Sequence, residues 1–109
     1  MFFSMNERRR ERLASFVKAE LAKFFKDELE LPSEVLVSIL SVTVSEGGGR
    51  ASAVLSIYPS AQFEGVAKVI KKGENGATRY IRGRLASKYS PTIHFVVIEN
   101  NTATNSAAW

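Results

Sequence analysis

The hydrophobic positions at the beginning of the chain recur at helical spacing and predict an amphipathic helix over residues 5–29. Ser4 and Glu7 have the spacing of a capping box, in which the two side chains bind backbone amides of the first helical turn. Pro32 ends the segment because it lacks an amide proton and disfavours helical angles in Leu31. The apolar stripe, which we interpret as core, consists of Leu13, Phe16, Val17, Leu21, Phe24 and Phe25.

A simple alternation then replaces the helical spacing and predicts a β-hairpin. β-Branched residues occupy alternate positions from Val35 to Val44, and the phase changes between Ile39 and Val42, which indicates either a β-bulge or burial on both faces. Glycines 47–49 separate this strand from a second alternating run over residues 51–58. No Gly-Lys-Ser/Thr sequence follows the glycines, so the pattern favours a flexible hairpin tip over a phosphate-binding loop.

Two shorter helices and a last strand complete the pattern. The first of these helices begins at Pro59-Ser60 and is interrupted by the segment Gly73-Glu74-Asn75-Gly76, which we expect to form a turn because Asn-Gly tolerates positive φ. The next helix is predicted over residues 77–89 and the last strand over residues 93–98. The helical stripes are Phe63, Val66, Ala67 and Ile70, and then Ala77, Ile81, Leu85 and Tyr89.

The resulting order is α-β-β-α-α-β, which predicts an α+β fold with a three-stranded sheet and helices packed on one face. The chain has 109 residues, which is the size of one domain. We assign residues 1–100 to this domain and expect the polar residues 101–109 to form a disordered tail.

The amino-acid composition excludes several kinds of active site. There is no Cys and a single His, which excludes disulfides, Cys-based zinc sites and cysteine nucleophiles, and we expect neither a metal nor a cofactor. The one histidine, His94, lies among alternating apolar residues and is better explained as a satisfied or surface-facing residue than as a general base, so we expect no enzyme. No apolar run approaches the roughly 20 residues that span a bilayer, and the first residues do not resemble a signal peptide. We therefore expect a cytoplasmic protein with no membrane partner and no small-molecule substrate.

Positive charge is concentrated in one segment. The chain has a net charge of +4, but residues 66–90 alone carry seven Lys and Arg against one Glu, which is +6. Such a segment is either a solvated helix face or an anion-binding surface, and its position around a glycine turn favours the second. The predicted RNA contacts are Lys68, Lys71, Lys72, Gly73, Gly76, Arg79, Arg82, Arg84 and Lys88. A second candidate patch, for which a solvated helix start is an equal explanation, is Arg8, Arg9, Arg10 and Arg12.

The predicted helix–GENG–helix element is the arrangement by which KH domains hold a nucleic-acid backbone. Glycines let phosphates approach the main chain, and we expect the amides of Ala77 and Thr78 to lie at a helix N-terminus, where the helix dipole favours anions. Arg79 and Arg82 project together beside the small residue Gly83. The alternative is that the four residues form only a tight turn.

An ordered set of motifs resembles the ribosome-binding factor A family. The set comprises Arg12-Leu13-Ala14 through Leu31-Pro32, the strand Val37 to Ser45, Tyr80-Ile81-Arg82 followed by Leu85-Ala86, and Pro91-Thr92-Ile93-His94-Phe95, and it spans about residues 8–100. The Ala-x-Gly that the family usually has before the aromatic–Ile–Arg element is here Ala77-Thr78-Arg79, so the glycine is absent. The basic C-terminal extension of some members is also absent, as in a divergent, minimal member.

The resemblance implies a type II KH-like fold and a non-enzymatic role in ribosome biogenesis. The expected partners of this protein are the immature small (30S) ribosomal subunit and the 16S rRNA of that subunit. The protein would assist the processing and maturation of this RNA, and we expect it to be a monomer when free. The alternative is a free-standing KH-type protein that binds single-stranded RNA and has no tie to ribosome assembly.

Overall fold

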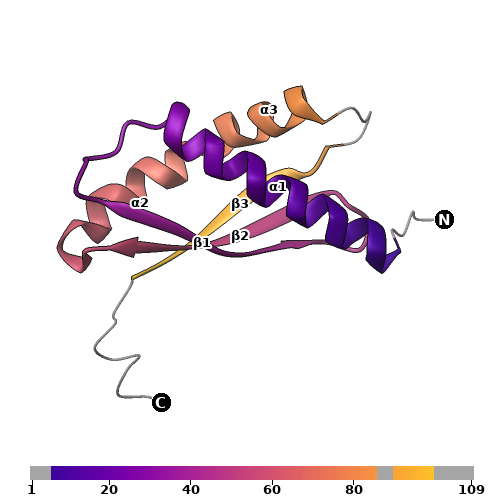
Figure 1. Ribbon diagram of the computed structural model, residues 1–109, viewed down its shortest axis with the longest axis horizontal. Coiled ribbons are helices and arrows are strands. Elements are labelled where there is room, and N and C mark those ends of the chain that lie inside the picture. Colours follow the sequence, from indigo (N-terminus) through magenta and orange to yellow (C-terminus); the bar gives the residue numbers. More distant parts are fainter. Residues whose placement is uncertain (1–5, 86–89, 100–109) are drawn as a thin grey trace, which may run out of the picture.

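The computed structural model describes residues 6–85 and 90–99, which form three helices and a three-stranded sheet within those ranges (Figure 1). The predicted order α-β-β-α-α-β is confirmed. The elements are α1 (Glu7–Asp27), β1 (Leu36–Val44), β2 (Arg50–Tyr58), the 3₁₀ turn η1 (Ser60–Gln62), α2 (Phe63–Lys72), α3 (Glu74–Arg84) and β3 (Thr92–Glu99).

The sheet is mixed, with the strand order β1-β2-β3. β1 and β2 form the predicted antiparallel hairpin, whereas β3 pairs with β2 in parallel. A parallel pair needs a crossover, and η1, α2 and α3 provide it. All three helices lie on the same face of the sheet, as expected from the sequence (Figure 1). On the opposite face, Leu36, Tyr58, Val96 and Ile98 are exposed.

The core lies between the helices and one face of the sheet. Alternate residues of β2, among them Ala53, Leu55 and Ile57, point toward the helices and are buried, as are Ile93 and Phe95 of β3. The apolar stripes predicted for the three helices supply the other side; their fully or nearly buried members are Val17, Leu21, Phe24, Phe25, Val66, Ile70, Ala77 and Ile81. This agreement follows from burying one face of each amphipathic element against the same layer.

The beginning of α1 differs from the predicted capping box. Asn6 is the N-cap, and its Oδ1 accepts a hydrogen bond of 2.9 Å from the Arg9 amide. Asparagine is among the strongest N-cap residues, and α1 begins at Glu7 rather than at residue 5. The predicted cap, Ser4, lies outside the described residues.

The phase change in the first strand is a bulge. The register between β1 and β2 shifts between Ile39 and Ser41, so Leu40 is the extra residue and the apolar side chains on either side of it still face the helices. At the hairpin tip, Gly48 has φ of 74°, a value that side-chain-bearing residues rarely adopt. The positive φ at the hairpin tip therefore explains why a glycine stands there, in agreement with the hairpin tip that the sequence favoured over a phosphate-binding loop.

The predicted turn at residues 73–76 is wrong. Only Gly73 separates α2 from α3, and Glu74, Asn75 and Gly76 form the first turn of α3. Gly73 has φ of −82° and ψ of −3°, and its amide binds the carbonyls of Val69 and Ile70 at the end of α2. The Asn-Gly pair does not take positive φ, because the tertiary hydrogen bond that Glu74 accepts from the Phe95 amide holds this segment helical.

Candidate nucleic-acid interface

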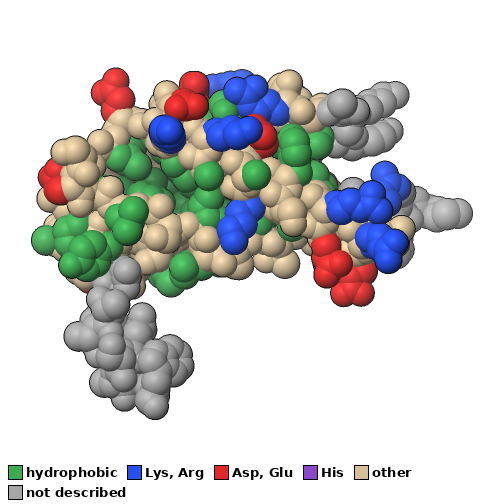
Figure 2. Space-filling view, in the orientation of Figure 1, with side chains coloured by type: hydrophobic (Ala, Val, Ile, Leu, Met, Phe, Trp, Pro, Cys, Tyr) green, Lys and Arg blue, Asp and Glu red, His purple; other side chains and the backbone are tan. Residues whose placement is uncertain are grey.

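The basic residues of α2 and α3 are the first candidates for an interface with nucleic acid. In Figure 2, Lys and Arg side chains gather over the helix layer and again at the beginning of α1. The structure places six of the seven predicted cations of residues 66–90 on α2 and α3; Lys88 lies outside the described residues. These six differ in whether their charge is already engaged by the protein.

Lys71 is engaged by the fold. Its ammonium group donates to the Glu74 carboxylate at 3.0 Å and to the Phe95 carbonyl at 3.0 Å. It therefore links α2, α3 and β3. A side chain held by both partners contributes to the local field but is poorly placed to reach a phosphate, so we interpret Lys71 as a structural residue.

Arg84 is also engaged. Its guanidinium lies 3.1 Å from the Glu20 carboxylate of α1 and 4.1 Å from the centroid of the Tyr80 ring. This combination of an ion pair and a cation–π contact joins the end of α3 to α1. Arg84 thus neutralises a charge of its own protein, and the sequence pattern, which counts charges without partners, could not distinguish it from Arg82.

Four cations remain for a ligand: Lys68, Lys72, Arg79 and Arg82 are exposed and make no hydrogen bond or ion pair with the part of the chain that the structure describes. Arg79 and Arg82 are three residues apart on α3 and lie on one side of it. Lys72 and Arg79 border the same groove at the α2–α3 junction. These four residues are named the free cations below.

In the second predicted patch, Arg10 is likewise engaged by the protein. The Arg10 guanidinium donates to the Val44 carbonyl through Nε at 3.2 Å and Nη2 at 3.0 Å, which fixes the start of α1 to the end of β1. Arg8, Arg9 and Arg12 are exposed and form no ion pair within the described ranges. The patch is therefore reduced to three arginines, with a solvated helix start still an equal explanation.

The expected phosphate site at the amides of Ala77 and Thr78 is wrong, because α3 begins earlier and both residues are buried. The Ala77 amide donates to the Gly73 carbonyl at 2.8 Å. Thr78 uses its hydroxyl, which donates to the Glu74 carbonyl at 3.1 Å and accepts from the Ile93 amide at 3.0 Å. The segment that the sequence assigned to phosphate binding thus anchors β3.

Glu74 is a residue whose role the sequence did not indicate. Its carboxylate accepts from the Phe95 amide at 2.7 Å as well as from Lys71. Burial raises the pKa of the Glu74 carboxyl, but the Phe95 amide and the Lys71 ammonium outweigh it, so the pKa lies below its usual value of 4.5. A carboxylate charged at neutral pH partly offsets the basic charge of this region.

No group of three His, Asp or Glu among the described residues could hold a metal ion. None of their helices is long and apolar enough to cross a membrane. His94 is half-buried in β3 and alternates with the buried Ile93 and Phe95, which places it on the other face of the sheet from the core.

This chain superposes on solved structures of other proteins. The crystal structure of ribosome-binding factor A from Thermus thermophilus superposes with a TM-score of 0.68 over 81% of this chain and 93% of that one, at 17% identity. The chain has the fold of ribosome-binding factor A. A solution structure from Thermotoga maritima, described as a candidate ribosome-binding factor A, also gives a TM-score of 0.68, at 16% identity over 84% of this chain and 89% of that one.

The likeness to ribosome-binding factor A is visible in the fold and not in sequence comparison. No protein-family model matches the chain, and no curated protein matches it either. The expected α+β fold is thus confirmed, with the element order α-β-β-α-α-β and a three-stranded sheet.

Proposed function

We propose that this chain is a ribosome-assembly factor that binds the immature small subunit through its 16S rRNA and assists the maturation of that RNA. The observation that carries the proposal is the fold, which matches ribosome-binding factor A over most of both chains. The proposed role is non-enzymatic and cytoplasmic, and needs no cofactor. The protein acts as a monomer that recognises RNA by charge and shape.

The free cations support an RNA-facing surface on α2 and α3. Each can pair with a phosphate without first breaking a contact inside the described part of the protein. Phosphate contacts orient a protein on RNA but do not read its sequence, so the preference for one rRNA region comes from RNA shape and unpaired bases. Lys71 and Arg84 keep the two helices in place beneath this surface.

Co-sedimentation with ribosomal subunits tests the proposal. We expect the full chain to migrate with immature small subunits at low salt, and Arg79→Glu with Arg82→Glu to abolish this migration. The matched control is Lys18→Glu with Arg50→Glu, which changes the net charge equally at two exposed residues away from α2 and α3.

The outcomes separate the alternatives. If the protein binds free RNA but never migrates with immature small subunits, the assembly role is wrong and a free-standing RNA-binding protein is supported. If both double variants release the subunit to the same degree, the interface is not on α3.

A further inference from the structure

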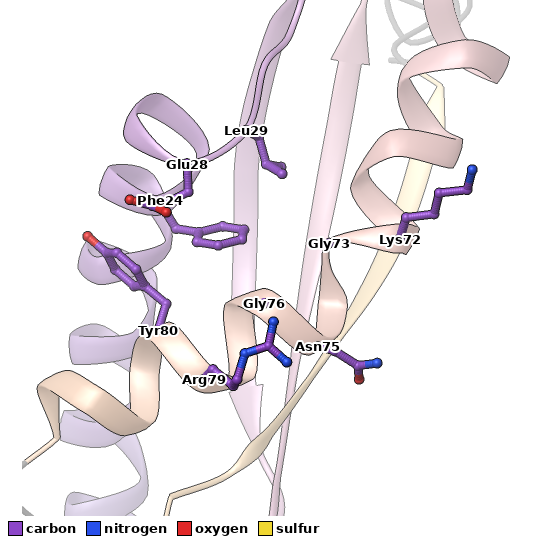
Figure 3. A pocket seen from close by; sticks show the side chains of 9 residues that line it. All are labelled: Phe24, Glu28, Leu29, Lys72, Gly73, Asn75, Gly76, Arg79 and Tyr80. Atoms are coloured by element: carbon purple, nitrogen blue, oxygen red, sulfur yellow. The ribbon is translucent and has the colours of Figure 1, made fainter.

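A groove of about 690 Å³ lies where the end of α1 meets the α2–α3 junction (Figure 3). Phe24 and Leu29, from α1 and the segment after it, form its apolar wall together with Tyr80 of α3. Gly73 and Gly76 leave the junction without side chains. This volume falls in the range of small-molecule pockets, and a flat group of one ring system fits it.

The apolar wall is held in place by the protein itself. The rings of Phe24 and Tyr80 meet edge to face, with centroids 5.4 Å apart. Arg84 lies against the Tyr80 ring and is fixed in turn by Glu20. The wall therefore exists before any ligand arrives, which lowers the entropic cost of binding.

The glycines keep the groove open in two ways. A Cβ at Gly73 would come within 3.2 Å of Leu29 Cδ2 and of the Ile70 carbonyl, so the glycine allows the chain after α1 to approach the junction. A Cβ at Gly76 would lie 3.7 Å from the nearest atom of the Phe24 ring, which is ordinary contact distance. A longer side chain at position 76 would extend over Phe24 and occupy the groove.

Polar groups of opposite sign border the groove. Figure 3 shows the Arg79 guanidinium beside Gly76, on the side of Asn75, while Lys72 and Asn75 point away from Phe24. Glu28 lies on the opposite wall, beside Phe24. A phosphate would be repelled near Glu28 and attracted by Lys72, whereas a base amino group could donate to Glu28.

We propose that this groove binds the base of a single unpaired RNA nucleotide, packed between the apolar wall and the Arg79 guanidinium. Its phosphate lies outward, toward Lys72, and Glu28 accepts a hydrogen bond from an amino group of the base. Bases in single strands commonly stack on arginine planes and aromatic rings, whereas bases in a duplex are not available. The inference rests on the proposed function and adds to it the place on the protein where one unpaired base is held.

The test compares a short oligoadenylate with a short RNA duplex of equal charge, using fluorescence anisotropy at one salt concentration. Gly76→Leu fills the groove without changing the charge, and Gly76→Ala is the matched control. We expect Gly76→Leu to weaken oligoadenylate binding about tenfold, which is the size of one lost stacking contact, and to leave duplex binding within about twofold. Gly76→Ala should bind both RNAs like the wild-type protein.

A second variant covers the case in which Gly76→Leu does not fold, which thermal unfolding would show. Arg79→Lys keeps the charge but removes the planar group, so we expect it to weaken oligoadenylate binding while duplex binding holds. Equal loss for both RNAs, or no loss in either variant, would overturn the groove proposal. If the wild-type protein binds neither RNA, the proposed function is contradicted instead. If the groove serves only a protein partner, Gly76→Leu and Arg79→Lys will leave oligoadenylate binding unchanged.

Discussion

The Glu74 carboxylate accepts a hydrogen bond of 2.7 Å from the Phe95 amide and thereby ties α3 to the edge strand β3. Thr78, one turn further along α3, accepts from the Ile93 amide at 3.0 Å. Lys71 donates to the Phe95 carbonyl. Because β3 is an edge strand, these three side chains take the place of a neighbouring strand for two of its residues.

Removing the Glu74 carboxylate should destabilise the protein. Glu74→Ala leaves the partly buried Phe95 amide without its acceptor and frees Lys71, and we expect a loss of about 1–3 kcal/mol in the free energy of unfolding. Urea unfolding measures it. Glu11→Ala, which removes an exposed carboxylate with no partner among the described residues, is the control and should change stability by less than about 0.5 kcal/mol. Equal effects of the two substitutions would contradict the role of Glu74.

The same carboxylate predicts a pH dependence. Because the pKa of Glu74 is lowered in the folded state, its contribution to stability is fully present above the usual carboxyl value of 4.5. The contribution is lost as the pH falls below this value and through the lowered pKa of the folded state. We therefore expect the stability difference between wild type and Glu74→Gln to narrow on acidification below pH 4.5. Urea unfolding over a pH series checks this, and a difference that stays constant would be evidence against the linkage.

Thr78 offers a test of the second hydrogen bond. Thr78→Val keeps the shape but leaves the buried Ile93 amide unpaired, for which we expect a cost of about 1–3 kcal/mol. Thr78→Ser retains the hydroxyl and should recover much of this loss, apart from the missing methyl group. Hydrogen exchange at the Ile93 amide provides a local measurement. If exchange there is no faster in the valine variant than in wild type, the hydroxyl is not the partner that protects this amide.

The two glycines at the α2–α3 junction should respond differently to alanine. At Gly73 the added Cβ meets a backbone oxygen and Leu29 at 3.2 Å, so we expect overpacking to cost about 1 kcal/mol or more. At Gly76, inside α3, the added Cβ meets the Phe24 ring only at the ordinary contact distance of 3.7 Å, so the change should stabilise the helix by about 0.5–1 kcal/mol. Thermal unfolding of both variants gives the comparison. Equal melting temperatures would show that the junction relaxes around the extra methyl group at Gly73.

The free cations of α3 predict a change in salt dependence. Arg79→Gln with Arg82→Gln should lower the slope of log affinity against log salt by about 0.7 for each lost phosphate contact on single-stranded RNA. Lys18→Gln with Arg50→Gln removes the same charge elsewhere on the surface and should leave the slope close to that of wild type. RNA titrations at several salt concentrations measure both slopes. An unchanged slope in the α3 variant would place the phosphate contacts on another surface.

Much of the fold followed from local patterns in the sequence. Helical spacing of apolar residues identified which faces of α1 and α2 are buried, and the phase change after Ile39 marked the place where the structure has a bulge, one of the two alternatives left open. Such patterns are readable because burial on one face is a local requirement of each element, whatever element lies opposite. The segment Gly73–Gly76 was misread for the complementary reason: glycine and asparagine favour a turn locally, and the hydrogen bond between Glu74 and Phe95 of β3, far along the chain, overrides that preference.

The sequence by itself determined that this protein is a basic α+β domain without Cys and with its positive charge concentrated in one segment. Only the tertiary structure decided which of those charges are free. Three basic side chains bind groups at least 24 residues away: Arg10 a carbonyl, Lys71 the edge of β3 and Arg84 a carboxylate. Arg79 and Arg82 make no such contact with the described residues. A charge count contains no information on such partners, because ion pairs and carbonyl contacts depend on which elements the fold brings together.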